Sequence, residues 1–393
     1  MVQETPAGQT VGLAFIGCGY VADFYAATLP NHEQLHLVGV WDRDTARSTA
    51  FAKEWDCRVF GSYDDVLADP RVDIVVNLTN PASHFEVSRA ALEAGKHVYS
   101  EKPFALDMAD AEALVELAED RGLLLSSAPC TLLGETAQTL WSALRKGVIG
   151  QPRLVYAELD DGMVHRMPHR EWYSASGAPW PAADEFAVGC TLEHSGYVLT
   201  WLTAFFGPVR RVVTYAAELL PDKGVGETFH TPDFSCGVLE FHSGVVARVT
   251  NSIVGPRDHS VRIIGDEGVL SIADTFRFGE PVLLSKAHPP AMESGRIGYL
   301  GEFTEYPLVR PADFPHRYTD THDIEFCRGI ADMAEQLRGR GPGHLNARHA
   351  LHVLELTLRL SGGDGAAGVH DIRTTFPAPA PMPWSNPGGA GDE

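Results

Sequence analysis

The feature that most limits how this chain can fold is a glycine-rich turn directly after an apolar run. The run Val11–Ile16 has the composition of a buried strand and continues into Gly17-Cys18-Gly19-Tyr20-Val21-Ala22. In this G-x-G-x-x-A spacing the first glycine permits a tight turn, the second lets the backbone approach a diphosphate, and the small last residue lets a helix pack closely. The turn therefore predicts a dinucleotide site. The residues expected there are Gly17, Gly19, Tyr20, Val21 and Ala22.

A carboxylate stands where such a site needs one. Asp42 comes 20 residues after Ala22, at the end of the second expected strand, where it would accept hydrogen bonds from an adenosine ribose. Its charge would repel the additional phosphate of NADP, so NAD is the expected cofactor. Arg43 is placed to bind that phosphate instead, which leaves NADP as the alternative.

The order of apolar and amphipathic segments predicts an α/β fold with two domains. Up to about residue 128, short apolar runs alternate with helical patterns, as in a doubly wound parallel sheet. Residues 129–376 show longer strand patterns and a hairpin signal at His242-Ser243-Gly244. These patterns predict an α+β domain on an open, mostly antiparallel sheet, with helices over 133–145, 318–337 and 347–360. The Pro/Gly-rich tail, 377–393, is expected to be extended or disordered.

Composition excludes several classes of partner. The chain has 31 basic and 52 acidic residues, a net charge of −21, which repels nucleic acid and anionic lipid. No run approaches the roughly 20 apolar residues of a membrane helix, and no secretory leader is evident, so a cytoplasmic protein is expected. The six cysteines form no Cys-x-x-Cys pair, which predicts reduced thiols rather than disulfides or a zinc site.

Lys102 is the first candidate for chemistry. It follows the short strand pattern His97–Ser100 and therefore lies at the carboxyl edge of the parallel sheet, where ligands bind in such folds. A partly desolvated lysine loses its proton readily, which suits proton transfer near neutral pH. An ordinary surface lysine that closes a strand is the alternative interpretation.

Taken together, these motifs resemble the Gfo/Idh/MocA family of nicotinamide-dependent oxidoreductases. The resemblance rests on the glycine turn, Asp42, the segment Asn77-Leu78-Thr79-Asn80-Pro81 with His84, and Ser100-Glu101-Lys102-Pro103. It implies a Rossmann domain and a second domain whose sheet often serves oligomerisation, so a homo-oligomer, dimer or tetramer, is expected. It also implies that Thr79, Asn80 and His84 border the nicotinamide and that Glu101 and Lys102 reach its ring, with Lys102-Pro103 in the cis form. A structural hydrogen-bonding role is the alternative for His84.

One helix departs from the family pattern. The family's Asp, His and Asp positions correspond to Glu193, Tyr197 and Thr200, which the spacing of four and three keeps on one face. Because the family histidine is missing, the base that takes the hydroxyl proton must be another group. The candidates are Tyr197 as a tyrosinate beside Lys102, Lys102 itself in its neutral form, and His194. Lys102 together with Tyr197 is the preferred interpretation.

The loop before this helix is the expected source of further substrate contacts. His165, Arg166, His169, Arg170 and Trp172 crowd into it, and aromatic faces with polar groups suit sugars. Arg166 or Arg170 would admit a carboxylate or phosphate on the substrate. No third ligand stands near the two histidines, so no metal is expected. The substrate-binding candidates are Lys102, Arg166, Arg170, Trp172, Glu193, His194 and Tyr197.

Three functions are consistent with this pattern. The first is an NAD(P)-dependent dehydrogenase or reductase acting on a secondary alcohol of a sugar, sugar derivative or cyclitol. The second is an NAD-dependent glycoside-cleaving enzyme that oxidises a hydroxyl transiently and eliminates the aglycone. The third is a non-catalytic protein that senses a sugar or dinucleotide. Retention of Lys102 argues against the third.

Overall fold

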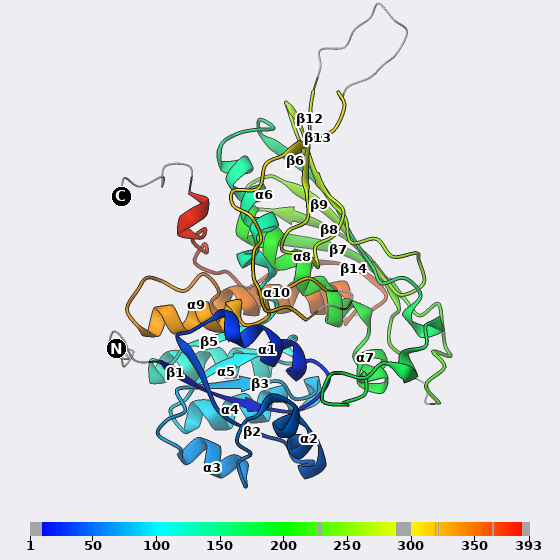
Figure 1. Cartoon of the computed structure of the whole chain (residues 1–393). Coiled ribbons are helices and arrows are strands. Elements are labelled where there is room, and N and C mark those ends of the chain that lie inside the picture. Colours follow the sequence, from blue (N-terminus) through cyan, green and yellow to red (C-terminus); the bar gives the residue numbers. More distant parts are fainter. Residues whose placement is uncertain are drawn as a thin grey trace, which may run out of the picture.

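A computed structural model describes residues 10–226, 229–287, 300–318, 320, 322–363 and 365–386. Two β-sheets dominate it, and several helices lie between them (Figure 1). The elements of the first sheet are β1 (Val11–Ile16), β2 (Leu35–Trp41), β3 (Ile74–Asn77), β4 (His97–Ser100) and β5 (Leu125–Ser127). Their order is β2-β1-β3-β4-β5, and every pairing is parallel. The predicted Rossmann sheet is thus confirmed.

The helices of this half follow its strands in the expected alternation. They are α1 (Ala22–Thr28), α2 (Thr45–Trp55), α3 (Tyr63–Ala68), α4 (His84–Glu93) and α5 (Met108–Arg121). Helix α5 shows why the sequence folds this way: Asp107 caps its first turn through a hydrogen bond from the Asp110 N–H, and Gly122 ends it in the left-handed conformation. Its buried stripe, Ala111, Leu114, Val115 and Ala118, packs beneath the sheet.

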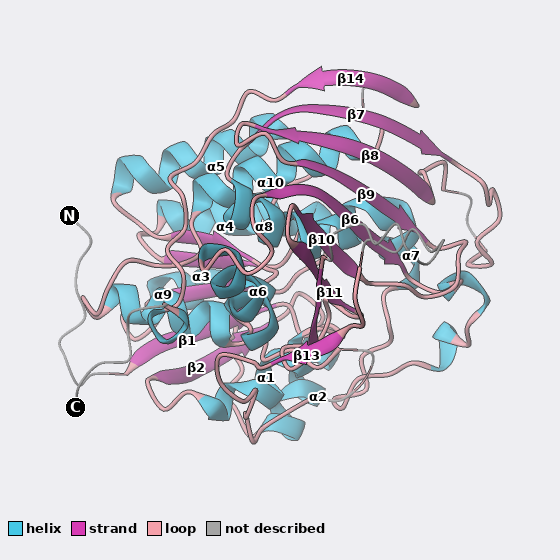
Figure 2. Cartoon of the chain, turned by 90° about the horizontal axis from the view of Figure 1, so that it is seen from above, coloured by secondary structure: helices cyan, strands magenta, loops and turns pink. Residues whose placement is uncertain are grey.

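The second sheet has nine strands in the order β13-β12-β11-β10-β6-β9-β8-β7-β14 (Figure 2). They are β6 (Pro152–Asp160), β7 (Val209–Ala217), β8 (Phe234–Phe241), β9 (Val246–Ser252), β10 (Val261–Gly265), β11 (Gly268–Ile272), β12 (Val282–Lys286), β13 (Thr304–Tyr306) and β14 (Ala367–Asp371). All pairings are antiparallel except that of β6 with β9, which is parallel, and the hairpin predicted at 242–244 joins β8 to β9. The expectation of a mostly antiparallel sheet is confirmed.

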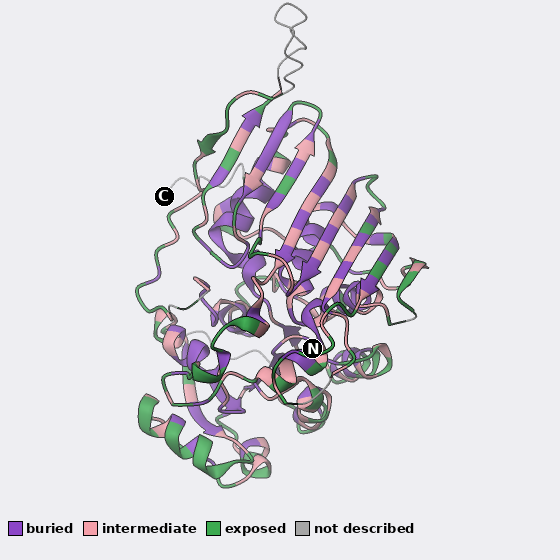
Figure 3. Ribbon diagram, turned by 90° about the vertical axis from the view of Figure 1, so that its right-hand side faces the viewer, coloured by how far each residue is buried: buried purple, intermediate pink, exposed green. Residues whose placement is uncertain are grey.

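Helices cover one face of this large sheet. They are α6 (Glu135–Arg145), α8 (Cys190–Phe206) and α10 (Ala347–Leu360), while α7 (Ala182–Val188) packs on α8 and α9 (Arg328–Leu337) contacts β5 of the first sheet. Helices α8 and α10 pack on each other and on the inner face of the sheet. Strand β7 alternates accordingly, with Val209 and Val212 buried and Val213 and Tyr215 exposed on the outer face, whose alternating bands are visible in Figure 3.

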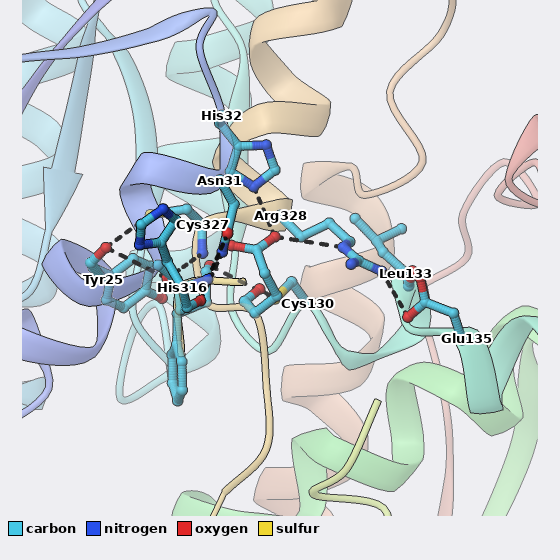
Figure 4. Close-up of polar contacts among 12 residues, drawn as sticks. Tyr25, Asn31, His32, Cys130, Leu133, Glu135, His316, Cys327 and Arg328 are labelled. Carbon is cyan, nitrogen blue, oxygen red and sulfur yellow. Dashed lines mark hydrogen bonds and ion pairs between the residues drawn. The ribbon is translucent and has the colours of Figure 1, made fainter. Parts of the chain in front are cut away.

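A polar network joins the two halves (Figure 4). His32 Nε2 lies 2.7 Å from Glu325 Oε2, and the same carboxylate oxygen lies 3.4 Å from Arg328 Nε. Arg328 also donates to the buried Glu135 on α6 at 2.9 Å. These groups are desolvated but mutually paired, which is the condition under which buried charges are tolerated. The network fixes α1 and its following turn against the second domain.

Two expectations from the sequence were wrong. The helix expected over 318–337 begins only at Arg328, and Asp320, His322 and Asp323 precede it. The described part of the tail, 377–386, is ordered: it ends in a 3-10 turn, Pro383–Ser385, that packs on α6, where the buried Ser385 donates to Gln138 and Arg310 lies 3.7 Å over the ring of Trp384. These side-chain contacts hold a segment that composition alone would leave loose. Residues 387–393 lie outside the described residues.

The six cysteines are free thiols, as expected. Within the described residues, no helix combines the length and apolarity needed to cross a membrane.

We predict that acid destabilises this fold by protonating two buried histidines of α10, the helix that packs on α8 and on the large sheet. His349 bonds Thr203 and His352 accepts the Val209 N–H; burial lowers the pKa of His349 from 6.5 to about 3 and that of His352 to about 4. The pKa of each histidine is lower in the folded protein than in the unfolded chain. Each histidine therefore contributes to the free energy of unfolding fully above pH 6.5, and this contribution is lost as the pH falls. Each histidine should remove about 1.4 kcal/mol per pH unit in that window.

Denaturant unfolding at several pH values between about 7.5 and 4.5 measures this slope. The double variant His349→Gln, His352→Gln should show a shallower pH dependence than the parent, whatever its stability at neutral pH. An unchanged slope would contradict the assignment.

Candidate active site and cofactor cleft

The glycine turn has the form that a dinucleotide needs. Gly17 has φ +95°, and a Cβ there would meet the Leu78 carbonyl oxygen at 2.5 Å, so only glycine fits. A Cβ on Gly19 would stand in open space, which leaves the backbone accessible to a ligand. Ala22 is buried and begins α1, as the motif requires. The residues of the turn therefore fit a bound diphosphate.

Asp42 is held beside this turn by the backbone. Its Oδ2 accepts the Cys18 N–H at 2.8 Å, and its Oδ1 accepts the Asp44 N–H at 2.8 Å. The carboxylate is thus fixed at the mouth of the glycine turn, where a ribose would lie. Arg43, the residue expected to bind the additional phosphate of NADP, is exposed.

The segment after β3 is fixed by His84. Its Nε2 lies 2.9 Å from the Thr79 carbonyl oxygen, and its Nδ1 lies 2.7 Å from that of Pro103. Burial lowers the pKa of His84 more than the two carbonyl groups raise it. The ring therefore ties the Thr79–Asn80 segment to the lysine loop, which matches the structural alternative considered for this histidine.

Glu101 fixes the other side of the cleft. It is buried and accepts the Tyr25 hydroxyl at 2.6 Å and the Lys102 N–H at 3.0 Å. The Lys102-Pro103 peptide is cis, as the family resemblance implied. Glu101 thereby joins α1, next to the glycine turn, to the loop that carries Lys102.

Lys102 meets the altered helix through Glu193. The distance from Lys102 Nζ to Glu193 Oε2 is 2.5 Å, and both side chains are largely buried. Burial alone would lower the pKa of Lys102, but the acidic groups around it, Glu193 first among them, together outweigh burial, and the pKa is raised well above its ordinary value. Lys102 is therefore a cation, and the neutral lysine that was considered as a base is not what this structure holds.

Tyr197 does not supply a tyrosinate either. Its ring packs against Phe276 with centroids 4.3 Å apart and lies 5.9 Å from Lys102 Nζ. Burial raises the pKa of Tyr197 more than the lysine charge lowers it. The expectation that Lys102 would bring the tyrosine below its ordinary pKa was therefore wrong, because desolvation of the anion dominates.

His194 has the environment of a general base. Its Nε2 lies 3.4 Å from Asp161 Oδ2, while its buried Nδ1 has no hydrogen-bond partner among the described residues. Burial lowers the pKa of His194 more than Asp161 raises it, so the ring is neutral near pH 7. Asp161 favours the tautomer with its proton on Nε2, which leaves the Nδ1 lone pair able to accept a proton.

Asp161 is itself held in the anionic form. Its Oδ1 lies 3.3 Å from His259 Nε2, and His259 Nδ1 lies 3.3 Å from Asp274. Burial opposes ionisation of Asp161, but the nearby histidines outweigh it and lower the pKa of Asp161. Burial likewise opposes the charge on His259, yet hydrogen bonds to the two carboxylates raise its pKa. The result is a chain of alternating histidines and carboxylates ending at His194.

A pocket opens beside His194 and Glu193. It lies between α7, α8 and the ends of β6 and β9. Glu185 lines it, and burial followed by the charge of Glu193 raises the pKa of Glu185 well above its ordinary value. Glu185 is thus a neutral acid next to a carboxylate. The described residues that line the pocket include Asp161, Val164, Trp180, Glu185, Phe186, Glu193, His194, Lys223 and Asp233.

Several predicted substrate contacts do not reach this pocket. Arg166 and Arg170 are exposed, and Arg170 donates to the Gly224 carbonyl. Trp172 packs edge-on against Trp180, which lines the pocket in its place. Among the described residues, no group of three or more potential ligands is arranged to hold a metal ion.

Sequence reasoning missed Asp161, Glu185 and His259. Asp161 follows an expected strand and His259 precedes one, so their positions at strand ends were visible. Nothing in the sequence indicated that these two ends are neighbours.

A second cavity lies behind Lys102, between β5, α8 and α10. Apolar side chains such as Leu192, Val353 and Leu354 supply much of its wall.

Comparison with known proteins agrees with this architecture. Residues 11–128 match the family model described as an oxidoreductase family with an NAD-binding Rossmann fold, and residues 137–271 match the Gfo/Idh/MocA C-terminal domain. The chain belongs to the Gfo/Idh/MocA oxidoreductase family. Its first domain is therefore an NAD(P)-binding Rossmann domain.

Two curated relatives of this Gfo/Idh/MocA protein are dehydrogenases. The UDP-N-acetylglucosamine 3-dehydrogenase of Acidithiobacillus ferrooxidans is 36% identical over 280 residues, which cover 66% of this chain and 86% of the relative. The trans-1,2-dihydrobenzene-1,2-diol dehydrogenase of Macaca fascicularis is 33% identical over 254 residues, 64% of this chain and 70% of the relative.

Solved structures share the fold. An oxidoreductase from Agrobacterium radiobacter, in complex with NAD+, L-tartaric acid and magnesium, superposes with a TM-score of 0.73 at 16% identity, over 93% of this chain and 99% of that one. The WlbA dehydrogenase from Bordetella pertussis, in complex with NADH and UDP-GlcNAcA, gives a TM-score of 0.68 at 18% identity, over 94% and 99%.

We predict that Lys102→Met lowers stability because it leaves the Glu193 carboxylate buried without its counter-ion. The expected loss in the free energy of unfolding is about 3 kcal/mol at pH 8 and less at pH 5, where protonation can neutralise the unpaired group. Thermal unfolding at the two pH values measures it.

The matched control is the double variant Lys102→Met, Glu193→Gln, which removes both charges and should recover most of the loss. A single variant as stable as the parent at pH 8 would show that the pair contributes little.

Proposed function

We propose that this protein is an NAD-linked oxidoreductase that transfers a hydride between the nicotinamide and a secondary alcohol of a sugar, sugar derivative or cyclitol. The observation that carries the proposal is the neutral His194, which is oriented by Asp161 and lines one pocket with Glu193, whose carboxylate pairs with Lys102. The dehydrogenase relatives, whose names specify a diol and a sugar nucleotide, support the reaction class. A cytoplasmic location remains part of the proposal.

The cofactor would be held by the residues around the glycine turn. Gly17, Gly19, Tyr20, Val21 and Ala22 would receive the diphosphate, Asp42 the ribose, and Thr79, Asn80 and Glu101 would border the nicotinamide. When bound, the nicotinamide supplies a hydride acceptor in the oxidised state and a hydride donor in the reduced state.

The protein's own groups divide the remaining work. Lys102, as a cation paired with Glu193, donates a hydrogen bond that orients the alcohol oxygen and stabilises negative charge developing on it. His194 Nδ1 takes the hydroxyl proton as the C–H hydride leaves, so that alcohol and oxidised cofactor become ketone, reduced cofactor and one proton on the enzyme. Asp161 stabilises the imidazolium that forms. Tyr197, with its raised pKa, keeps its proton and does not act as the base.

The direct test is incubation with NAD and a panel of sugars, polyols and cyclitols while reduced nicotinamide is followed by absorbance. Net accumulation supports the dehydrogenase. Product release from glycosides without net reduction would instead identify the glycoside-cleaving alternative, and tight NAD binding with no turnover would identify the sensing protein.

The pH profile should identify the base. Because the pKa of His194 is lowered below 6.5, kcat/KM for oxidation should be level above pH 6.5 and fall only on the acid side. His194→Asn should lower kcat by about 10²- to 10⁴-fold. The control His370→Asn, on the distant edge strand β14, should leave kcat unchanged. A rate that keeps rising up to pH 10 would instead assign the proton transfer to Lys102 or Tyr197.

Cofactor preference should depend on Asp42. Asp42→Ser is expected to weaken NAD binding about tenfold, because it removes the group that accepts hydrogen bonds from the ribose. The variant should also reduce the preference for NAD over NADP, because it removes the charge that repels the additional phosphate of NADP. Titration with reduced cofactors, followed by fluorescence, measures both affinities. Arg43→Ala is the matched control, and equal weakening by the two variants would contradict the assignment.

Assembly is proposed on the resemblance to the family. The outer face of the large sheet carries exposed Val213, Tyr215 and Val369, and it is the surface on which a homo-oligomer would form.

A further inference from the structure

The pocket beside His194 has two walls of different chemistry. One wall is polar and carries the carboxyl groups of Asp161, Glu185 and Glu193 around His194. The other is apolar, with Val164, Trp180, Phe186 and Ile253. A substrate that fills this pocket therefore meets hydrogen-bonding groups on one side and an aromatic surface on the other.

The aromatic wall is built and rigid. Trp180 meets Trp172 with ring centroids 5.3 Å apart and an interplanar angle of 71°, and it meets Phe186 at 5.9 Å and 81°. Such edge-to-face contacts fix ring orientation. Trp180 nevertheless remains partly exposed, while Val164 and Phe186 behind it are buried. One indole surface is thus held in place and left available for contact.

The polar wall has no cation available for an anionic substrate. Lys223 is the one lysine or arginine among the described lining residues. It is 2% exposed, its Nζ donates to the backbone carbonyls of 220, 229 and 231, and it lies 3.5 Å from Asp233. Its three protons and its charge are already used.

The charges of the neighbouring cations are also compensated. Lys102 pairs with Glu193, and Arg257 donates to Asp274 at 2.9 Å. Asp161 remains an anion because the nearby histidines lower its pKa. A carboxylate or phosphate entering this pocket would lose its hydration without gaining a counter-ion, which is costly.

We propose that the pocket contains a subsite, formed by Val164, Trp180, Phe186 and Ile253, for an apolar ring or aglycone attached to the reacting alcohol, and that the enzyme selects uncharged substrates. This inference rests on the proposed function, because it takes the pocket beside His194 as the substrate pocket. The aromatic wall packs against the substituent, while Glu185, as a neutral acid, and His194 contact hydroxyl groups.

Three probes separate the two parts of the proposal: methyl β-glucoside, phenyl β-glucoside and phenyl β-glucuronide. Binding of each to the NAD-loaded protein is measured by calorimetry. The phenyl glucoside should bind about tenfold or more tightly than the methyl glucoside, because it buries a ring on Trp180. The glucuronide, which differs from the phenyl glucoside by one carboxylate, should bind at least about tenfold more weakly than it.

Trp180→Ala should abolish the tighter binding of the phenyl glucoside relative to the methyl glucoside. Trp180→Phe should retain part of this difference in affinity. The matched control is Trp384→Ala, which changes a tryptophan packed on α6 far from the pocket. This variant should leave the ratio of the two glucoside affinities unchanged. Equal binding of the methyl and phenyl glucosides, or binding of neither, would overturn the subsite. A glucuronide that binds as well as the phenyl glucoside would overturn the selection for uncharged substrates.

These outcomes are distinct from failure of the proposed function. Selective binding of the phenyl glucoside with no reduced nicotinamide from any alcohol would support the subsite and reject the dehydrogenase. Turnover of anionic sugars in preference to neutral ones would support the dehydrogenase and reject the selection for uncharged substrates.

Discussion

The ion pair between Lys102 and Glu193 is the contact on which the arrangement of this site depends. Lys102 stands on a loop of the Rossmann domain and Glu193 on the helix that supports the large sheet, so one 2.5 Å contact joins the two domains inside the cleft. The pair is tolerated because each charge compensates the other in a region with little water. The hydrogen bonds of Glu101 and His84 hold the lysine loop from behind, which leaves the ammonium directed at the helix.

This pairing decides which groups can exchange protons. It keeps Lys102 charged, and the accompanying desolvation keeps Tyr197 protonated. The neutral, partly unpartnered group is His194, one residue along the same helix from Glu193. The protein thus places a fixed cation and a neutral imidazole next to each other, a combination that suits removal of a proton from an alcohol whose oxygen is becoming negative.

The sequence predicted those parts of the site that local geometry determines. Three of its residues each follow a strand of the parallel sheet: Gly17, Asp42 and Lys102. The carboxyl ends of parallel strands meet at one edge of the sheet, independently of how the rest of the chain folds. Asp161 and His259 could not be placed this way, because their contact requires β6 and β10, about a hundred residues apart, to be neighbours. The charge of Lys102 was left open for the same reason: the direction of its pKa shift depends on Glu193, a partner from another domain. The packing of Ser385 on α6 likewise depends on distant side chains.

The position of β6 in the large sheet has a consequence for biosynthesis. This strand lies in the sheet interior between β10 and β9, and both partners are encoded much later in the chain. During translation, residues 152–160 therefore leave the ribosome with two open edges, and they wait until about residue 252 has emerged before one edge is covered and until about residue 265 before the other is covered. A nascent chain in that interval presents an unpaired strand to its surroundings, so its yield in cells depends on chaperones and on the rate of synthesis as well as on the stability of the finished fold.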